Sequence, residues 1–177
     1  MFVQGLKENY FLIKSGFSML DDAKKLGFVF CRLNENIRNH FEDSFDQVRT
    51  IKTPYGEMGE IMYHIFESPN IWINFLTNKT IEVKPYNELT TKELFYAEWK
   101  MVEARLTKYL ENSKELDYGK RMHIKFEDDG FEMDTSIEEL LMHISHHAFY
   151  HRGTVGALAR ENNLAPLPSS NWFFSLK

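Results

Sequence analysis

Histidines are the residues of this sequence whose spacing points most clearly to chemistry. Four of the seven fall within nine residues, at His143, His146, His147 and His151. On a helix, His143, His147 and His151 share one face, because each follows the last by about one turn. That face also carries an apolar stripe made of Leu140, Ile144, Val155 and Leu158. We therefore expect these three imidazoles to point inward and His146 to point elsewhere.

This spacing fits a metal site. Two histidines four residues apart on a helix come within ~6 Å of each other, and their ring nitrogens can reach one ion at about 2.0–2.1 Å. A third ligand should come from another helix, where His64 is the best candidate, since His40 and His123 are expected at a helix end and in a hairpin. Three histidines with an open fourth position are typical of catalytic metal sites. His143 could be a ligand, a supporting residue or a structural one.

The alternative is three core histidines without a metal. Buried side by side, they would leave several ring nitrogens in need of hydrogen-bond partners, at about 1–3 kcal/mol for each one unmet. Spacing therefore favours a metal over a purely structural role.

Other chemically capable residues give weaker signals. Glu60 precedes His64 by one turn and could orient its imidazole or take a proton. Arg152 follows His151 and could recognise an anion at the rim of a pocket or form a structural salt bridge. Cys31 is the single cysteine and follows an apolar run, so we interpret it as a buried small hydrophobic residue, with a catalytic thiol as the alternative.

The elements that must position these residues are mainly helical. Apolar side chains at spacings of three and four predict helices over about 18–40 and from near Tyr55 through Leu76, the latter with a break or kink at Pro69. A third helix is predicted from Thr90, with Glu93 completing a capping box.

Apolar residues that alternate with polar ones on either side of an Asp-Gly turn predict a hairpin over 121–134. A last helix is predicted from Thr135 or Ser136, each with a glutamate three residues later, to about Asn162. Residues 41–53 are interpreted as an irregular connection.

The expected fold is all-α, an antiparallel four-helix bundle with a small β-hairpin before the last helix. We expect a single domain over 1–177: an N-terminal extension over 1–17, a bundle over 18–163, and an apolar tail over 164–177. The tail contains Trp172 and should pack on the bundle or on a second subunit.

Composition excludes several classes of function. A net charge of −5 disfavours nucleic-acid binding, and no apolar run reaches the ~20 residues that a membrane span needs. The lone cysteine and the lack of a signal peptide favour a soluble, cytoplasmic protein.

The region around the last histidines resembles a known family. Residues 141–153 are similar to the last-helix signature of the DinB/YfiT-like superfamily: a histidine, three residues, a second histidine and then Arg-Gly. The second-helix signature, a histidine followed some eight residues later by Trp and an apolar run, resembles His64 to Trp72 and the residues after it. The likeness covers most of 18–177. The sequence departs from the family pattern at three places. Pro69 falls within the second helix, Tyr150 stands where a further histidine is frequent, and residues 1–17 have no recognised counterpart.

The resemblance implies a four-helix bundle, often a homodimer, that holds one nickel, zinc or iron ion through His64, His147 and His151, with His143 beside them. It also implies a small-molecule substrate and, in some members, S-transfer or isomerisation with a low-molecular-weight thiol. We therefore expect a metal-dependent enzyme, with thiol-dependent transfer ahead of hydrolysis. A non-catalytic, stress-associated metal-binding dimer is the main alternative, and an interaction module built on the aromatic tail is a weaker one.

Overall fold

The computed structural model describes residues 19–54, 56–112, 117, 119–126 and 130–168. Helices dominate this part of the chain, and two short antiparallel hairpins accompany them. In chain order the elements are α1 (Met19–His40), α2 (Phe45–Arg49), β1 (Lys52–Thr53), β2 (Gly56–Glu57), α3 (Met58–Thr77), the 3-10 helix η1 (Tyr86–Glu88), α4 (Lys92–Asn112), β3 (Arg121–Lys125), β4 (Glu132–Ser136) and α5 (Ile137–Glu161). The all-α prediction is confirmed.

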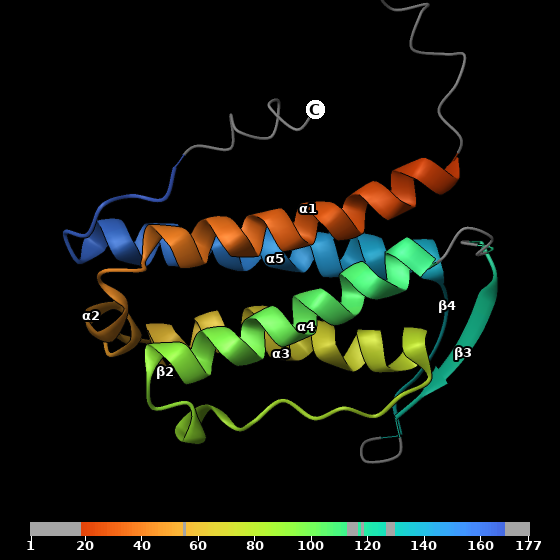
Figure 1. The fold of residues 1–177 in the computed structure, drawn as a ribbon, viewed down its shortest axis with the longest axis horizontal. Coiled ribbons are helices and arrows are strands. Elements are labelled where there is room, and N and C mark those ends of the chain that lie inside the picture. The colour runs from red at the N-terminus through yellow and green to blue at the C-terminus, as the bar shows by residue number, and fades with distance from the viewer. Residues whose placement is uncertain (1–18, 55, 113–116, 118, 127–129, 169–177) are drawn as a thin grey trace, which may run out of the picture.

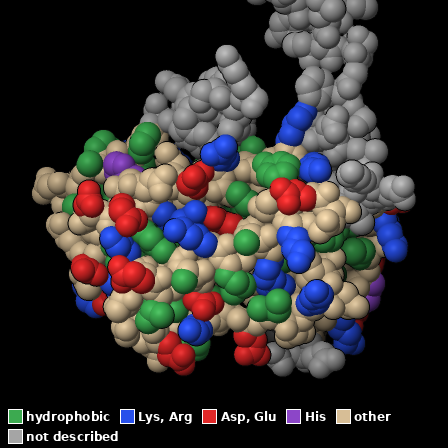
Figure 2. All heavy atoms as spheres, viewed as in Figure 1, with side chains coloured by type: hydrophobic (Ala, Val, Ile, Leu, Met, Phe, Trp, Pro, Cys, Tyr) green, Lys and Arg blue, Asp and Glu red, His purple; other side chains and the backbone are tan. Residues whose placement is uncertain are grey.

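The four long helices pack around one apolar core. Helix α1 packs against α5 and α4, and α3 packs against α4 and α5. In the view of Figure 1, α1 lies over α5 and α4 lies over α3. Their inner faces bury large side chains, among them Phe30, Phe66, Trp99 and Ile144. The face that α1 and α4 present to solvent carries acidic and basic side chains intermixed with apolar ones (Figure 2).

The directions of the helices differ from a simple antiparallel arrangement. Consecutive helices α3 and α4 run the same way, and so do α1 and α5, whereas the packed pairs α1–α4 and α3–α5 run in opposite directions (Figure 1). The cause is the segment 78–91, which returns along the whole length of α3 before α4 begins. At ~3.3 Å per extended residue it easily covers the ~30 Å of a 20-residue helix.

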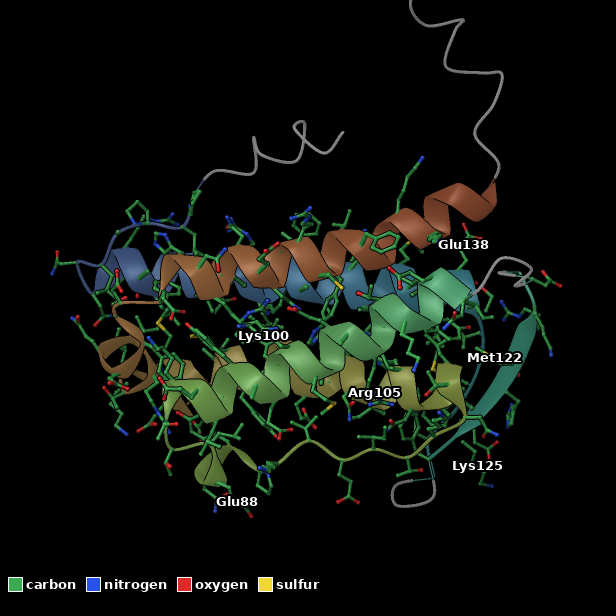
Figure 3. The ribbon with its side chains drawn as sticks, in the orientation of Figure 1. Glu88, Lys100, Arg105, Met122, Lys125 and Glu138 are labelled. Carbon is green, nitrogen blue, oxygen red and sulfur yellow. The ribbon has the colours of Figure 1, made fainter. Side chains whose placement is uncertain are left out.

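Polar side chains of α3 and α4 hold this return segment in place. Helix α3 ends where Asn78 adopts a left-handed conformation, φ 50°, which an asparagine tolerates well. The backbone of Ile81 then accepts a hydrogen bond from Asn70 Nδ2 at 2.7 Å and donates one to Asn74 Oδ1 at 3.2 Å. Arg105 of α4, labelled in Figure 3, donates to the side-chain oxygens of Asn70 and Asn74. One guanidinium therefore couples α4 to both asparagines that fix the return segment.

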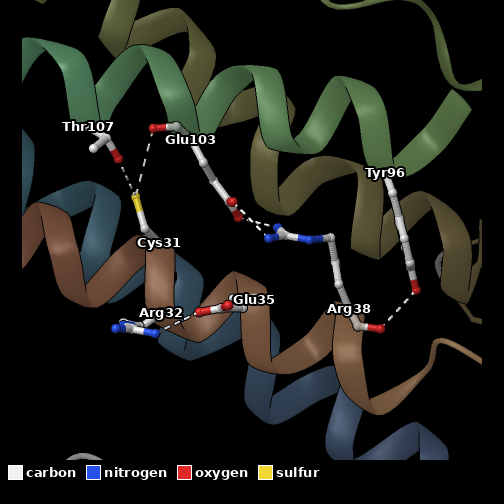
Figure 4. A network of polar contacts seen from close by, with 7 residues as sticks. All are labelled: Cys31, Arg32, Glu35, Arg38, Tyr96, Glu103 and Thr107. Atoms are coloured by element: carbon white, nitrogen blue, oxygen red, sulfur yellow. Dashed lines mark hydrogen bonds and ion pairs between the residues drawn. The ribbon is translucent and has the colours of Figure 1, made fainter. Parts of the chain in front are cut away.

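A buried ion pair joins α1 to α4. Arg38 donates to both carboxylate oxygens of Glu103, one contact measuring 2.8 Å, and the two side chains are only 6% and 12% exposed. The Arg38 guanidinium also lies 5.5 Å from the centre of the Trp99 ring, and Tyr96 donates its hydroxyl to the Arg38 carbonyl at 3.1 Å (Figure 4). Since every one of these partners lies on α4, the network fixes α1 against α4.

Several predicted boundaries are corrected. The stretch 41–53 is not irregular, because it contains α2 and β1. Helix α3 begins at Met58, after the β1–β2 hairpin, and it runs unbroken through Pro69, so of the predicted break or kink the break is absent. The Pro69 side chain is buried, and the helix continues past it despite the one backbone hydrogen bond that a proline cannot donate.

Capping explains where α4 and α5 start. Helix α4 begins at Lys92, and Thr91, not Thr90, supplies the capping oxygen, accepting from the Leu94 backbone N–H at 3.3 Å. The capping box predicted for the last helix is confirmed with Ser136: its hydroxyl accepts from Glu139 N, and the Glu139 carboxylate accepts from Ser136 N. The predicted hairpin is confirmed as β3–β4, in which Arg121 pairs with Ser136 and Lys125 with Glu132.

The ends of the chain are described only in part. Leu164 and Leu167, at the start of the predicted tail, pack against the core, and Ala165 O lies 2.8 Å from His40 Nε2. The N-terminal extension over 1–17 and the aromatic residues from Trp172 onward lie outside the described residues. Within the described ranges, none of the helices is long and apolar enough to span a bilayer.

Candidate metal site

The structure brings His64, His147 and His151 together. Nε2 of His147 lies 3.1 Å from Nε2 of His64 and 3.1 Å from Nε2 of His151. One ring nitrogen from each residue lies within 4.8 Å of the other two. Three imidazoles from two helices therefore direct the same kind of atom at one small volume.

Antiparallel packing of α3 and α5 creates this arrangement. His147 and His151 follow each other by one turn of α5, and His64 of α3 faces them across the helix pair. Ile65 and Phe66 beside His64, and Ile144 and Ala148 beside His147, are fully buried. These apolar neighbours fix the rotation of both helices, and that rotation sets the direction of the three rings.

The histidines lie at the edge of the core, not inside it. The His64 side chain is 47% exposed, and His147 and His151 are half-buried. The prediction that His143, His147 and His151 point into the core is wrong for His143, which is exposed, and holds only in part for His147 and His151. His147 and His151 lie along the border between the buried and the solvent-facing sides of α5. The site therefore has one side open to solvent.

The arrangement of donors and acceptors fits a metal ion better than hydrogen bonding. Ligand nitrogens 2.0–2.1 Å from a tetrahedral ion are about 3.3 Å apart, close to the two observed spacings. A neutral imidazole has one N–H and one acceptor nitrogen. Nε2 of His147 therefore cannot donate to one neighbour and accept from the other, so hydrogen bonding satisfies only one of these two contacts.

Electrostatics keeps the two α5 histidines neutral. Burial, together with the nearby His151, His64 and His143, lowers the pKa of His147 to about 4. Burial and His64 also lower the pKa of His151. Neutral imidazole is the form that binds metals, so both residues have free nitrogen lone pairs at pH 7.

The outward nitrogens of the rings differ in their surroundings. Nδ1 of His64 lies 3.5 Å from a carboxylate oxygen of Glu67, one turn further along α3. Nδ1 of His147 is buried and has no hydrogen-bond partner among the described residues. The Glu67 carboxylate thus lies beside the His64 nitrogen that faces away from the cluster, where a carboxylate can orient a metal-ligating histidine.

Glu60 has a structural contact at the start of α3. Its carboxylate accepts a hydrogen bond from the Glu57 backbone N–H at 2.6 Å and completes the N-terminal cap of α3. Glu67 is the residue that sequence reasoning missed. Its position three residues after His64 was a readable signal, because residues three apart on a helix are neighbours.

His143 lies beside the three-histidine cluster and is not one of its members. Its ring is 5.9 Å from the His147 ring and 5.4 Å from the Trp72 ring, centre to centre. Of the roles left open for His143, this placement favours a supporting one, since its ring separates His147 from Trp72.

Arg152 and Cys31 are engaged elsewhere. Arg152 donates to Asn36 Oδ1 at 2.7 Å and to the Pro168 carbonyl at 2.9 Å, and so joins α5 to α1 and to the segment after α5. Cys31 is half-buried between α1 and α4, with its Sγ 3.6 Å from Thr107 Oγ1, and burial raises its pKa to about 11. The first placement favours the structural interpretation of Arg152, and the second agrees with an unreactive thiol.

Comparison with known proteins identifies the family. The model of the DinB family matches residues 32–170, a range that contains α3, α4, α5 and all three clustered histidines. The chain therefore belongs to the DinB family. It is similar to Protein DinB of Bacillus subtilis (strain 168), with 24% identity over 161 residues that cover 85% of this chain and 92% of that protein.

Proposed function

We propose that this protein binds one divalent metal ion through His64, His147 and His151 and uses it in catalysis. The observation that carries the proposal is the convergence of three Nε2 atoms, two pairs of them 3.1 Å apart, on one side of the α3–α5 pair. Nickel, zinc and iron are all compatible with imidazole ligands, and their availability decides among them.

The exposure of the cluster favours catalysis over a purely structural role. Structural zinc sites are closed by four protein ligands, whereas the described residues contribute three here. The half-exposed His64 ring leaves a route for a small molecule. A bound ion would make a thiol or a water at the open position more acidic.

Thiol-dependent group transfer is the reaction class that we propose, with metal-dependent hydrolysis as the alternative. The support is the resemblance to DinB-type proteins that act with a low-molecular-weight thiol. The protein's own cysteine cannot take this part, because Cys31 lies between α1 and α4 and its pKa is raised to about 11. The thiol would have to come with the substrates.

We further propose that the four long helices form a four-helix bundle of the DinB type and that two copies assemble as a homodimer. Packing of each long helix against two others supports the bundle. The dimer rests on the family resemblance alone, and light scattering after size-exclusion chromatography tests it.

Elemental analysis of the purified protein tests the metal proposal. We expect about one equivalent of nickel, zinc or iron in the natural sequence and less than a tenth of that in His147→Ala. His146→Ala is the matched control, since it removes an exposed histidine of the same helix that lies outside the cluster. Two results would refute the proposal: no metal in the natural sequence after titration with all three ions, or as much metal in His147→Ala as in His146→Ala.

An activity screen separates the two reactions. The metal-loaded protein is incubated with an electrophile and a small thiol such as cysteine, or with an ester and no thiol. Thiol consumption that is lost in His147→Ala supports transfer, and ester cleavage without thiol supports hydrolysis. The absence of both activities would favour a non-catalytic metal protein.

A further inference from the structure

A chain of aromatic rings leads away from the three histidines. The His143 ring contacts His147 on one side and Trp72 on the other. Beyond Trp72, ring centres continue at 5.7 Å to Phe126, from there at 5.4 Å to Phe75 and at 5.8 Å to Phe131. We call the four residues Trp72, Phe75, Phe126 and Phe131 the aromatic strip.

The aromatic strip is assembled from two separate parts of the fold. Trp72 and Phe75 belong to α3, and Phe126 and Phe131 flank the turn of the β3–β4 hairpin. Figure 1 shows this hairpin beside the end of α3 from which the return segment leaves. Phe75 follows His64 by eleven residues, which is about three helical turns. Phe75 therefore lies on the same face of α3 as His64, about 16 Å further along the axis. One face of α3 therefore joins the metal site to the strip.

The strip remains partly open to solvent. Phe75 is 36% exposed and Phe131 is 52% exposed, while Trp72 and Phe126 are half-buried. Aromatic side chains usually bury most of their 150–250 Å², so these exposed fractions leave on the order of 250 Å² of aromatic surface in contact with water.

The size of this surface indicates the kind of partner. A stable protein–protein contact buries about 800 Å² on each side, so the strip alone is smaller than such an interface. The face of a small organic molecule that carries one ring or a short alkyl chain matches it. Its continuity with the three histidines through His143 also places it where the body of a bound substrate would lie.

We propose that the aromatic strip is the substrate-binding surface of this protein and that its substrate carries an apolar body, aryl or alkyl, joined to the reacting polar group by a short chain. This inference rests on the proposed metal site. The polar group lies at His64, His147 and His151, and the apolar body extends past His143 over Trp72 and toward Phe75.

Two hydroxamates that share a metal-binding head test the inference. Acetohydroxamate carries only a methyl group, and 4-phenylbutyrohydroxamate adds a phenyl ring on a short chain. Metal content is measured first; cobalt-loaded protein is then titrated with each compound, and binding is followed by the cobalt absorption spectrum and by tryptophan fluorescence. We expect the phenyl compound to bind about tenfold more tightly, the effect of burying one ring against an aromatic surface.

Variants localise that gain. Trp72→Ala and Phe75→Ala should each reduce the gain to less than threefold and leave both metal content and acetohydroxamate affinity unchanged. Phe75→Ala keeps the test valid if Trp72→Ala does not fold, since Phe75 lies outside the buried core. The matched control is Leu94→Ala, which removes an equally exposed apolar side chain from α4 and should keep the full gain.

The results separate the two proposals. Equal affinity for both compounds in protein that holds one equivalent of metal would overturn the aromatic strip and leave the metal site intact. A tenfold gain that persists in both Trp72→Ala and Phe75→Ala would overturn it as well. Failure to take up metal, seen before any hydroxamate is added, would refute the metal site itself and with it this inference.

Discussion

Removing the charge of Glu103 is predicted to destabilise the protein strongly. Glu103→Gln keeps the shape of the side chain but leaves the Arg38 guanidinium buried without a counter-ion, since the Arg38 side chain is only 6% exposed. Breaking a buried pair in this way costs about 3–5 kcal/mol. For a chain of this size each kcal/mol lowers the melting temperature by about 2–4 °C, so we expect a decrease of roughly 6–20 °C.

Urea denaturation followed by circular dichroism measures the free energy of unfolding. Glu35→Gln is the matched control, because Glu35 pairs with Arg32 on the same helix in an exposed setting, where a pair contributes about 0–1 kcal/mol. Arg38→Met combined with Glu103→Leu should recover most of the loss, since an apolar pair needs no charge compensation. Metal content should be unchanged in all variants, because the metal site lies on the α3–α5 side.

Two results would refute this reasoning. One is a loss below 1 kcal/mol in Glu103→Gln, the value of a solvent-exposed pair. The other is a double variant as unstable as Glu103→Gln alone, which would place the cost in packing and not in the uncompensated charge.

Three further predictions concern the site and the helix that carries most of it. In the metal-free protein, the folded-state pKa of His147 is about 4, below its ordinary value near 6.5, so the unfolded chain binds more protons between these values. The stability that neutral His147 contributes should therefore be fully present above pH 6.5 and be lost as the pH falls toward 4. The free energy of unfolding of the metal-free protein, minus that of metal-free His147→Ala, should decrease over this range; a difference that stays constant or increases would contradict the prediction. Glu67→Gln should weaken metal binding about tenfold, measured by competition with a chelator, whereas Glu60→Gln should not change it. Ser136→Ala should lower the free energy of unfolding by about 1 kcal/mol through loss of the α5 cap, and a melting temperature equal to that of the natural sequence would show that the cap contributes nothing.

Sequence patterns predicted the long helices well and their directions poorly. The 3–4 spacing of apolar residues located α1, α3, α4 and α5 to within a few residues, because this periodicity is a local property of one helix. The parallel course of α3 and α4 depends on the return segment, which Asn70, Asn74 and Arg105 hold from two different helices. No local pattern contains that information.

For the site, sequence reasoning found the cluster but not its surroundings. The four-residue spacing of His147 and His151 and the family signature identified the three converging histidines. Their partial exposure was missed, because an apolar stripe shows which side of a helix is buried but not where its border lies. Glu60 and Glu67 both lie about one turn from His64, and the capping of α3 by Glu60 decides between them. That cap forms where β2 meets α3, a junction that the sequence reasoning did not predict.

The positions of the three histidines along the chain have a consequence for folding. His64 and His147 are separated by 83 residues, so an ion held between them would close a long loop, as a disulfide does. Closing a loop of this length restricts the unfolded chain and can contribute about 4–5 kcal/mol by a chain-entropy argument. The isolated α5 segment keeps His147 and His151 but cannot supply His64. Tight metal binding therefore requires α3 and α5 to be paired, which makes metal affinity a direct report on whether the chain has reached its native topology.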